Sequence, residues 1–188
     1  DVYKRQVLPI SPPLTWSGIR WCNRLSRPTT GLRMAITIDL QNDAALASVP
    51  RKQQFQKWVA AALLEHHNEL EQTIRIVDET ESHALNSRFR DKHNATNVLA
   101  FPSDSDLLNY ECLGDLVICA PIVVAEATAQ GKPVEAHWAH LVVHGMLHLQ
   151  GFGHDNDDET ALMEAREIKI LNILGYTNPY NESGISLQ

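Results

Sequence analysis

The sequence predicts an α+β fold in which a small mixed β-sheet is covered by about five helices. Three observations carry this prediction. Apolar and polar residues alternate over Ala35–Leu40 (AITIDL), which is the period of a half-buried strand. Several short β-branched runs follow it, and the stretches between them have the three- and four-residue apolar spacing of helices. Together these patterns indicate a layer of helices packed on a small sheet.

The first half of the chain alternates strands and helices. Arg51–Leu70 is predicted as a helix whose buried face carries Phe55, Trp58, Val59, Ala62 and Leu63. The β-branched run Thr73–Val77 predicts a second strand. Asp78 or Thr80 can cap the helix that follows, and this helix is expected to run to about Phe89.

Proline and glycine mark the boundaries in the second half. Thr96–Phe101 is predicted as a third strand, closed by Pro102, and Leu116–Cys119 as a fourth. Glycine just past a helix end can take the left-handed conformation that terminates the helix. Helices are therefore predicted at Pro121–Gln130, ended by Gly131, and at Asp157–Leu174, ended by Gly175.

Between these two helices lies the most informative segment, a helix that Pro133 starts in its first turn. His144 and His148 are four residues apart on this helix, so their imidazoles lie on one face about one turn apart. Gly151 can end the helix and reverse the chain, which would bring His154 back to the same point. The spacing predicts a zincin-like site of three histidines on a helix and the turn after it.

Three neutral imidazoles leave a fourth coordination position open, as in catalytic rather than structural zinc sites. We therefore predict one Zn²⁺ per chain, held by His144, His148 and His154. The alternative is that these are ordinary core or surface histidines with hydrogen-bond partners. Four protein ligands would close the open position, so His140, on the same helical face, is expected to form hydrogen bonds or contact the substrate cleft, and so is His137. The other histidines considered, His66, His67 and His83, are expected on exposed helical faces.

The residue after the first histidine separates this motif from a protease signature. The spacing His-x-x-x-His-x-x-Gly-x-x-His is that of the metzincins, which carry a glutamate as general base directly after the first histidine. Gly145 stands at that position here. A metal ion could still activate water, so hydrolysis stays open while peptide-bond cleavage is disfavoured.

Four sequence motifs, of which the last two are contiguous, together resemble the YbeY family of metal-dependent endoribonucleases, which are rRNA maturation factors. These motifs are LNSRFRDKHNATNVLAFP, GDLVIC, AHWAHLVV and HGMLHLQGFGH, and the resemblance runs from about Ile74 to about Tyr180. It implies a zinc on the three histidines, action on single-stranded RNA, and a cytoplasmic role in 3′-end processing of small-subunit ribosomal RNA and in ribosome quality control. The family's usual Gly-Tyr-Asp-His differs here because Gly153 replaces the aspartate. Asp155 is the candidate to replace this carboxylate.

The chain is acidic overall, with a net charge of −7, so an RNA substrate requires basic residues concentrated at the cleft. The segment SRFRDKH supplies such a concentration. Arg90 matches the arginine of the family's Asn-x-x-Tyr-Arg pattern, and a guanidinium can hold a phosphate bidentately. We predict Arg90 as the catalytic cation and Arg88 and Lys92 as candidate RNA contacts. A solvated helix end would explain any one of these cations as well.

The domain organisation is predicted as one globular domain at 34–180, preceded by a basic segment and followed by a short tail at 181–188. Residues 1–33 carry six basic side chains against one acid and lack a sustained helical or strand period. Met34 is the expected natural start, which would make 1–33 a non-native or leader segment, expected to be disordered. An organellar transit peptide is the alternative. No apolar run is long enough for a membrane span, and three cysteines without a C-x-x-C pair favour a reducing compartment.

The predicted function is metal-assisted hydrolysis of an RNA phosphodiester, with either water or the RNA 2′-hydroxyl as nucleophile. The general base is left open because Gly145 occupies its usual place, and Asp155 is a speculative substitute. A non-catalytic ribosome-assembly factor with a structural zinc, which binds a small-subunit ribosomal protein or an assembly GTPase, is the second hypothesis. A metalloprotease is the third.

Overall fold

The computed structural model describes residues 35–42, 49–64, 69–103 and 112–181. These residues form a four-stranded sheet and five helices, which confirms the predicted α+β class. In chain order the elements are β1 (Ala35–Gln41), α1 (Lys52–Ala62), β2 (Glu69–Val77), α2 (Glu79–Arg90), β3 (Val98–Pro102), β4 (Gly114–Cys119), α3 (Ala120–Ala129), α4 (Val134–Leu149) and α5 (Asp157–Leu174). Residues 1–34, 43–48, 65–68, 104–111 and 182–188 lie outside the described residues, and so do His66 and His67.

The sheet is mixed, with strand order β1-β2-β4-β3. β1 pairs with β2 and β2 with β4 in parallel, whereas β3 pairs with β4 antiparallel and forms one edge. Parallel pairing requires a crossover connection; that from β1 to β2 contains α1, and that from β2 to β4 contains α2 and β3.

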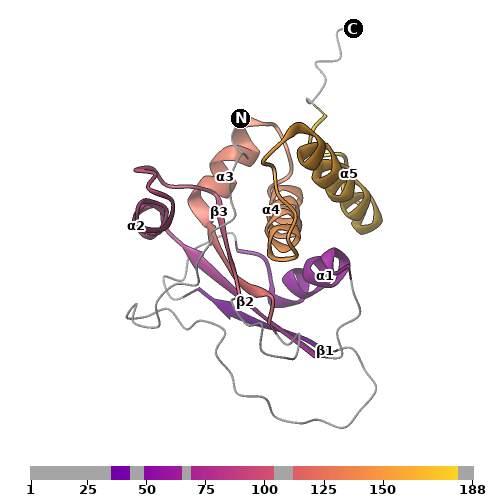
Figure 1. Ribbon diagram of the computed structural model, residues 1–188, viewed down its shortest axis with the longest axis horizontal. Coiled ribbons are helices and arrows are strands. Elements are labelled where there is room, and N and C mark those ends of the chain that lie inside the picture. The colour runs from indigo at the N-terminus through magenta and orange to yellow at the C-terminus, as the bar shows by residue number, and fades with distance from the viewer. Residues whose placement is uncertain (1–34, 43–48, 65–68, 104–111, 182–188) are drawn as a thin grey trace, which may run out of the picture.

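Alternate residues of β3 and β4 face two separate cores because strand side chains point to opposite faces in turn. Val98 and Leu116 belong to the larger core, which includes residues of α1, α3, α4 and α5. Leu99 and Val117 belong to the smaller core, to which α2 contributes Leu85. Figure 1 shows the same division, with α2 on one side of the strands and α1, α4 and α5 on the other. The histidine helix and α2 therefore pack on opposite faces of the sheet.

The predicted helix Arg51–Leu70 was too long. α1 ends at Ala62, and Leu63 has an extended backbone with ψ of 131°. Leu70 instead lies in β2, where it pairs with Ile36. No glycine or proline marks the end of α1, so the pairing of β2 with β1 overrides the helix-compatible spacing of the sequence.

Three strand starts also differ from the predicted ones. β2 and β4 begin earlier than expected, at Glu69 and Gly114, and β3 begins later, at Val98. Thr96 is excluded from β3 because its backbone N–H and C=O both bond the Ser82 hydroxyl of α2. The boundaries of the other helices were predicted better: Asp78 caps α2 by accepting from the backbone N–H of Glu81. None of the described helices has the length and apolarity needed to cross a membrane.

Candidate metal centre

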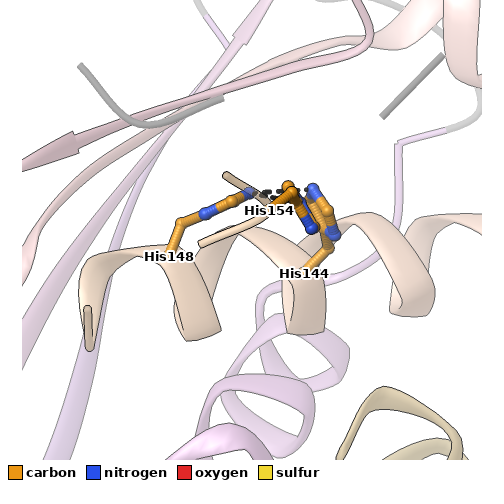
Figure 2. Close-up of side chains that lie close together, drawn as sticks. All are labelled: His144, His148 and His154. Atoms are coloured by element: carbon orange, nitrogen blue, oxygen red, sulfur yellow. Dashed lines mark hydrogen bonds between the residues drawn. The ribbon is translucent and has the colours of Figure 1, made fainter. Parts of the chain in front are cut away.

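Three histidine rings converge between the end of α4 and the segment that follows it. The Nε2 atoms of His144 and His148 lie 3.1 Å apart, and those of His148 and His154 are separated by the same distance. Figure 2 shows His144 and His148 rising from one helix while His154 reaches toward them from the returning chain. Gly151 makes this return with φ of +89°, in the left-handed region that the sequence predicted. The predicted convergence of the three side chains is therefore confirmed.

The hydrogen bonds of the other ring nitrogens determine where the protons are. His144 Nδ1 lies 2.5 Å from a Glu167 carboxylate oxygen, and His148 Nδ1 lies 2.8 Å from the backbone carbonyl oxygen of Phe152. Both partners can only accept when Glu167 is ionised, so each Nδ1 carries the proton. The Nε2 atoms of His144 and His148 then face each other with lone pairs. Nitrogens on a tetrahedral zinc at 2.0–2.1 Å would be about 3.3 Å apart, so the donor set fits such an ion.

Burial keeps two of these imidazoles, those of His148 and His154, neutral. His144 and His148 are buried almost completely, and His154 is 9% exposed. Burial and, next, the proximity of His144 lower the pKa of His148 to about 3, and the same two causes lower the pKa of His154. A metal-binding histidine must be neutral, so at pH 7 His148 and His154 are in the form that binds metal.

Gly145 lies against the sheet rather than beside the three histidine rings. A Cβ at this position would lie 2.7 Å from Leu116 Cδ2 and 3.5 Å from Val98 Cγ2. A larger side chain here would therefore have to displace the β3–β4 core. This packing explains why the position that carries the metzincin glutamate is a glycine in this chain.

His137 and His140 have the hydrogen-bonding roles that the sequence favoured. His137 Nε2 lies 2.8 Å from Glu126 of α3, and His140 Nε2 lies 3.3 Å from Glu167 of α5. Both rings are buried. His83 is exposed on α2, as expected.

Sequence reasoning missed Glu167. This residue is fully buried on α5 and bonds both His144 and His140, while Tyr180 donates a hydrogen bond to its second oxygen. Burial alone would raise the pKa of the carboxyl, but its electrostatic interaction with His144 and the hydrogen bonds from both histidines hold the pKa well below its usual range. The signal was present in the sequence: Glu167 lies on the buried stripe of α5 with Met163, Ile170 and Leu171. A glutamate on such a stripe is rare without a partner.

Two further residues of α5 support the segment between His148 and His154. The Arg166 guanidinium lies over the Phe152 ring at 4.7 Å from its centroid. Glu159 accepts a hydrogen bond from the backbone N–H of Asp155 and lies 3.3 Å from where a Cβ of residue 153 would be. A carboxylate is therefore present beside Gly153. It belongs to Glu159, which accepts a hydrogen bond from the backbone N–H of Asp155.

The predicted cations lie elsewhere. Arg90 is the last residue of α2, on the face of the sheet opposite α4, and is followed by Asp91 in the left-handed conformation. Arg90 Nη2 is buried and has no hydrogen-bond partner among the described residues, and burial lowers the pKa of this guanidinium. Arg88 is exposed with its guanidinium 5.4 Å from the Phe89 ring centroid, and Lys92 is also exposed. The structure thus brings together the three histidines but not the histidines and Arg90.

Comparison with known proteins gives one consistent family. The family model described as "Endoribonuclease YbeY" matches residues 37–175, which include the three histidines, Arg90 and Glu167. The "Endoribonuclease YbeY" of Methylococcus capsulatus is 54% identical over 148 residues, 78% of this chain and 97% of that protein. The proteins of the same name from Pseudomonas entomophila and Nitrosococcus oceani are 50% and 49% identical, over 77% and 78% of this chain and 93% and 98% of their own lengths.

Proposed function

Because the chain belongs to the endoribonuclease YbeY family, we propose that it is a zinc-dependent endoribonuclease that hydrolyses single-stranded RNA. The proposed role is 3′-end maturation of small-subunit ribosomal RNA and late quality control of ribosomes. The observation that carries the proposal is the position of His148 Nε2, which lies 3.1 Å from the Nε2 atoms of both His144 and His154. Three ligands of this kind leave a position open for a reacting group.

His144, His148 and His154 are the residues proposed to hold the metal. When bound there, a zinc ion would supply Lewis-acid activation of water or of the RNA 2′-hydroxyl. Glu167 and the Phe152 carbonyl keep the protons of His144 and His148 on Nδ1, so Nε2 of both rings is available to the metal.

Arg90 is proposed to neutralise the phosphate, with Arg88 and Lys92 as further RNA contacts. Arg90 is half-buried at the end of α2, and its buried Nη2 has no hydrogen-bond partner among the described residues; a planar guanidinium can hold a phosphate bidentately. Because α2 and α4 pack on opposite faces, this role requires RNA that passes around the β3 edge of the sheet. A single strand has the flexibility for such a path, which favours single-stranded over duplex RNA.

The cellular setting follows from the same proposal. The domain at 34–180 acts in the cytoplasm on ribosomal RNA, and small-subunit proteins or an assembly GTPase are the partners it would meet there. The related proteins come from bacteria, where ribosomes are assembled in the cytoplasm. The segment 1–33 is proposed to be dispensable for this activity.

Incubation of the purified full chain with single-stranded RNA and with casein, each with and without a chelator, tests the proposal. Cleavage of RNA alone is expected, with loss of cleavage in chelator and recovery when zinc is restored. RNA that stays intact although one metal ion is bound per chain would instead favour the non-catalytic assembly factor. Cleavage of casein would favour a protease, which the packing of Gly145 against Leu116 disfavours.

A further inference from the structure

We propose that Glu167 is a positioning residue for the metal centre, which fixes the proton and the ring orientation of His144 and is itself fixed by His140 and Tyr180. This inference rests on the proposed function only in its assumption that the three histidines bind a metal. Glu167 lies on α5, outside the histidine motif, and contacts the site through His144 alone among the three proposed ligands.

The two oxygens of the carboxylate have different partners. Oε1 accepts from His144 Nδ1 at 2.5 Å. Oε2 accepts from the Tyr180 hydroxyl and lies 3.3 Å from His140 Nε2. Glu167 and His144 are both 0% exposed, so water does not compete for these bonds. Contacts at both oxygens prevent rotation of the carboxylate and therefore fix the plane of the His144 ring.

The same group of atoms has the composition of a second metal site, since ligand atoms of His140, His144 and Glu167 lie within 4.8 Å of one another. The distances favour a hydrogen-bonded network instead. Two ligands of one tetrahedral zinc would be about 3.3 Å apart, whereas His144 Nδ1 and Glu167 Oε1 are separated by 2.5 Å. A carboxylate that receives the second ring proton of a metal-binding histidine orients the ring and raises its basicity.

Glu167→Gln tests this role because it retains the size of the side chain and removes one acceptor oxygen. The amide NH₂ group must then face either the Nδ1–H of His144 or the Tyr180 hydroxyl, and neither arrangement preserves all the hydrogen bonds. We expect zinc affinity, measured on the full chain by competition with a chromophoric chelator, to fall roughly 10- to 100-fold. The visible absorption spectrum of the Co²⁺-substituted protein should change as well, because the His144 ligand is reoriented.

Glu126→Gln is the matched control. Glu126 also accepts from a histidine of α4, His137, but that histidine is not a proposed ligand. The control should retain wild-type zinc affinity and the wild-type Co²⁺ spectrum. Tyr180→Phe removes only the hydroxyl that donates to Glu167, so a smaller loss, less than about tenfold, is expected; this variant decides the matter if Glu167→Gln does not fold.

Wild-type affinity and an unchanged Co²⁺ spectrum in the folded variants would overturn the inference, even if their melting temperatures fall, because Glu167 would then be a purely structural residue. An equal loss of affinity in Glu126→Gln would also overturn it. A wild-type protein that binds zinc but does not cleave RNA would remove the proposed function and leave this inference standing.

Discussion

The histidine cluster at the end of α4 and the cation at the end of α2 differ in how completely the protein itself satisfies them. In the cluster, Nδ1 of His144 and of His148 each have an acceptor within 2.8 Å, and the acceptor of His144 is held by further hydrogen bonds. Arg90 has a buried Nη2 without a hydrogen-bond partner in the described part of the chain. The first region therefore has two ring protons held in place by the protein, and the second has a buried polar atom that no described residue satisfies.

From this difference we predict which measurable property depends on each region. A prebuilt set of ligands costs little to organise when a metal arrives, so the cluster should govern metal affinity. A guanidinium stabilises the negative charge that develops on a phosphate in the transition state, so Arg90 should govern the reaction with RNA. Variants of the two regions are therefore expected to affect different measurements.

The largest effect is expected from His148→Ala. The variant removes the Nε2 atom that lies 3.1 Å from both neighbouring Nε2 atoms. Metal content measured by elemental analysis should fall from about one ion per chain to near zero, and RNA cleavage should be lost with it. His83→Ala, at an exposed histidine of α2, is the control and should change neither measurement. Full metal content in the triple variant of His144, His148 and His154 would exclude this site.

Arg90→Ala should separate the two regions most sharply. We expect the rate of RNA cleavage to fall by roughly 10²–10³, equivalent to about 3–4 kcal/mol of transition-state stabilisation. Zinc content and melting temperature should stay at wild-type values because Arg90 has no contact with the histidines. Arg90→Lys should restore little, since an ammonium group lacks the bidentate geometry of a guanidinium.

Two results would contradict this assignment. Full cleavage by a folded Arg90→Ala protein would move the role to Arg88 or Lys92. A melting temperature that falls in parallel with activity would show that Arg90 is a structural residue.

A smaller effect is expected from Arg166→Ala. The guanidinium packs over Phe152, whose carbonyl oxygen accepts the Nδ1–H of His148. Loss of this cation–π contact, worth about 0.5–1 kcal/mol at a partly exposed site, should weaken zinc binding by about two- to fivefold in chelator competition. Lys169→Ala on the same helix is the control. A zinc affinity equal to wild type would show that Phe152 is held without Arg166.

The smallest effect is expected from removal of residues 1–33. The family match begins at residue 37 and the first described strand at Ala35. A chain that starts at Met34 should therefore have the same zinc content, cleavage rate and melting temperature as the full chain. A melting temperature lower by several degrees would show that the leader packs on the domain.

The parts of the site that sequence could predict are local in the chain. His144, His148 and His154 lie within one helix and one turn, so helical spacing and Gly151 were sufficient. Glu167 is 23 residues from His144 on another helix, and its partnership depends on how α5 packs against α4. No local rule gives that packing, although a glutamate on an apolar stripe marks the residue for attention.

In the fold, too, the features that sequence could predict are those with local signals. The strand and helix types and Gly175 at the end of α5 were predicted, because alternation, helical spacing and a left-handed glycine are local signals. The end of α1 was not predicted, because Leu70, which the prediction placed in this helix, lies in β2 and pairs with β1. The side of the sheet on which Arg90 lies was also inaccessible from sequence, since it depends on which core α2 joins.

The contact between Tyr180 and Glu167 also bears on the order in which the protein can mature during its synthesis. The ribosome makes α4 before α5, so a nascent chain presents all three histidines before it contains the carboxylate that orients His144. Tyr180 leaves the ribosome later still. The contacts that orient His144 are therefore complete only once Tyr180 has left the ribosome, and a nascent chain that exposes only the three histidines lacks them.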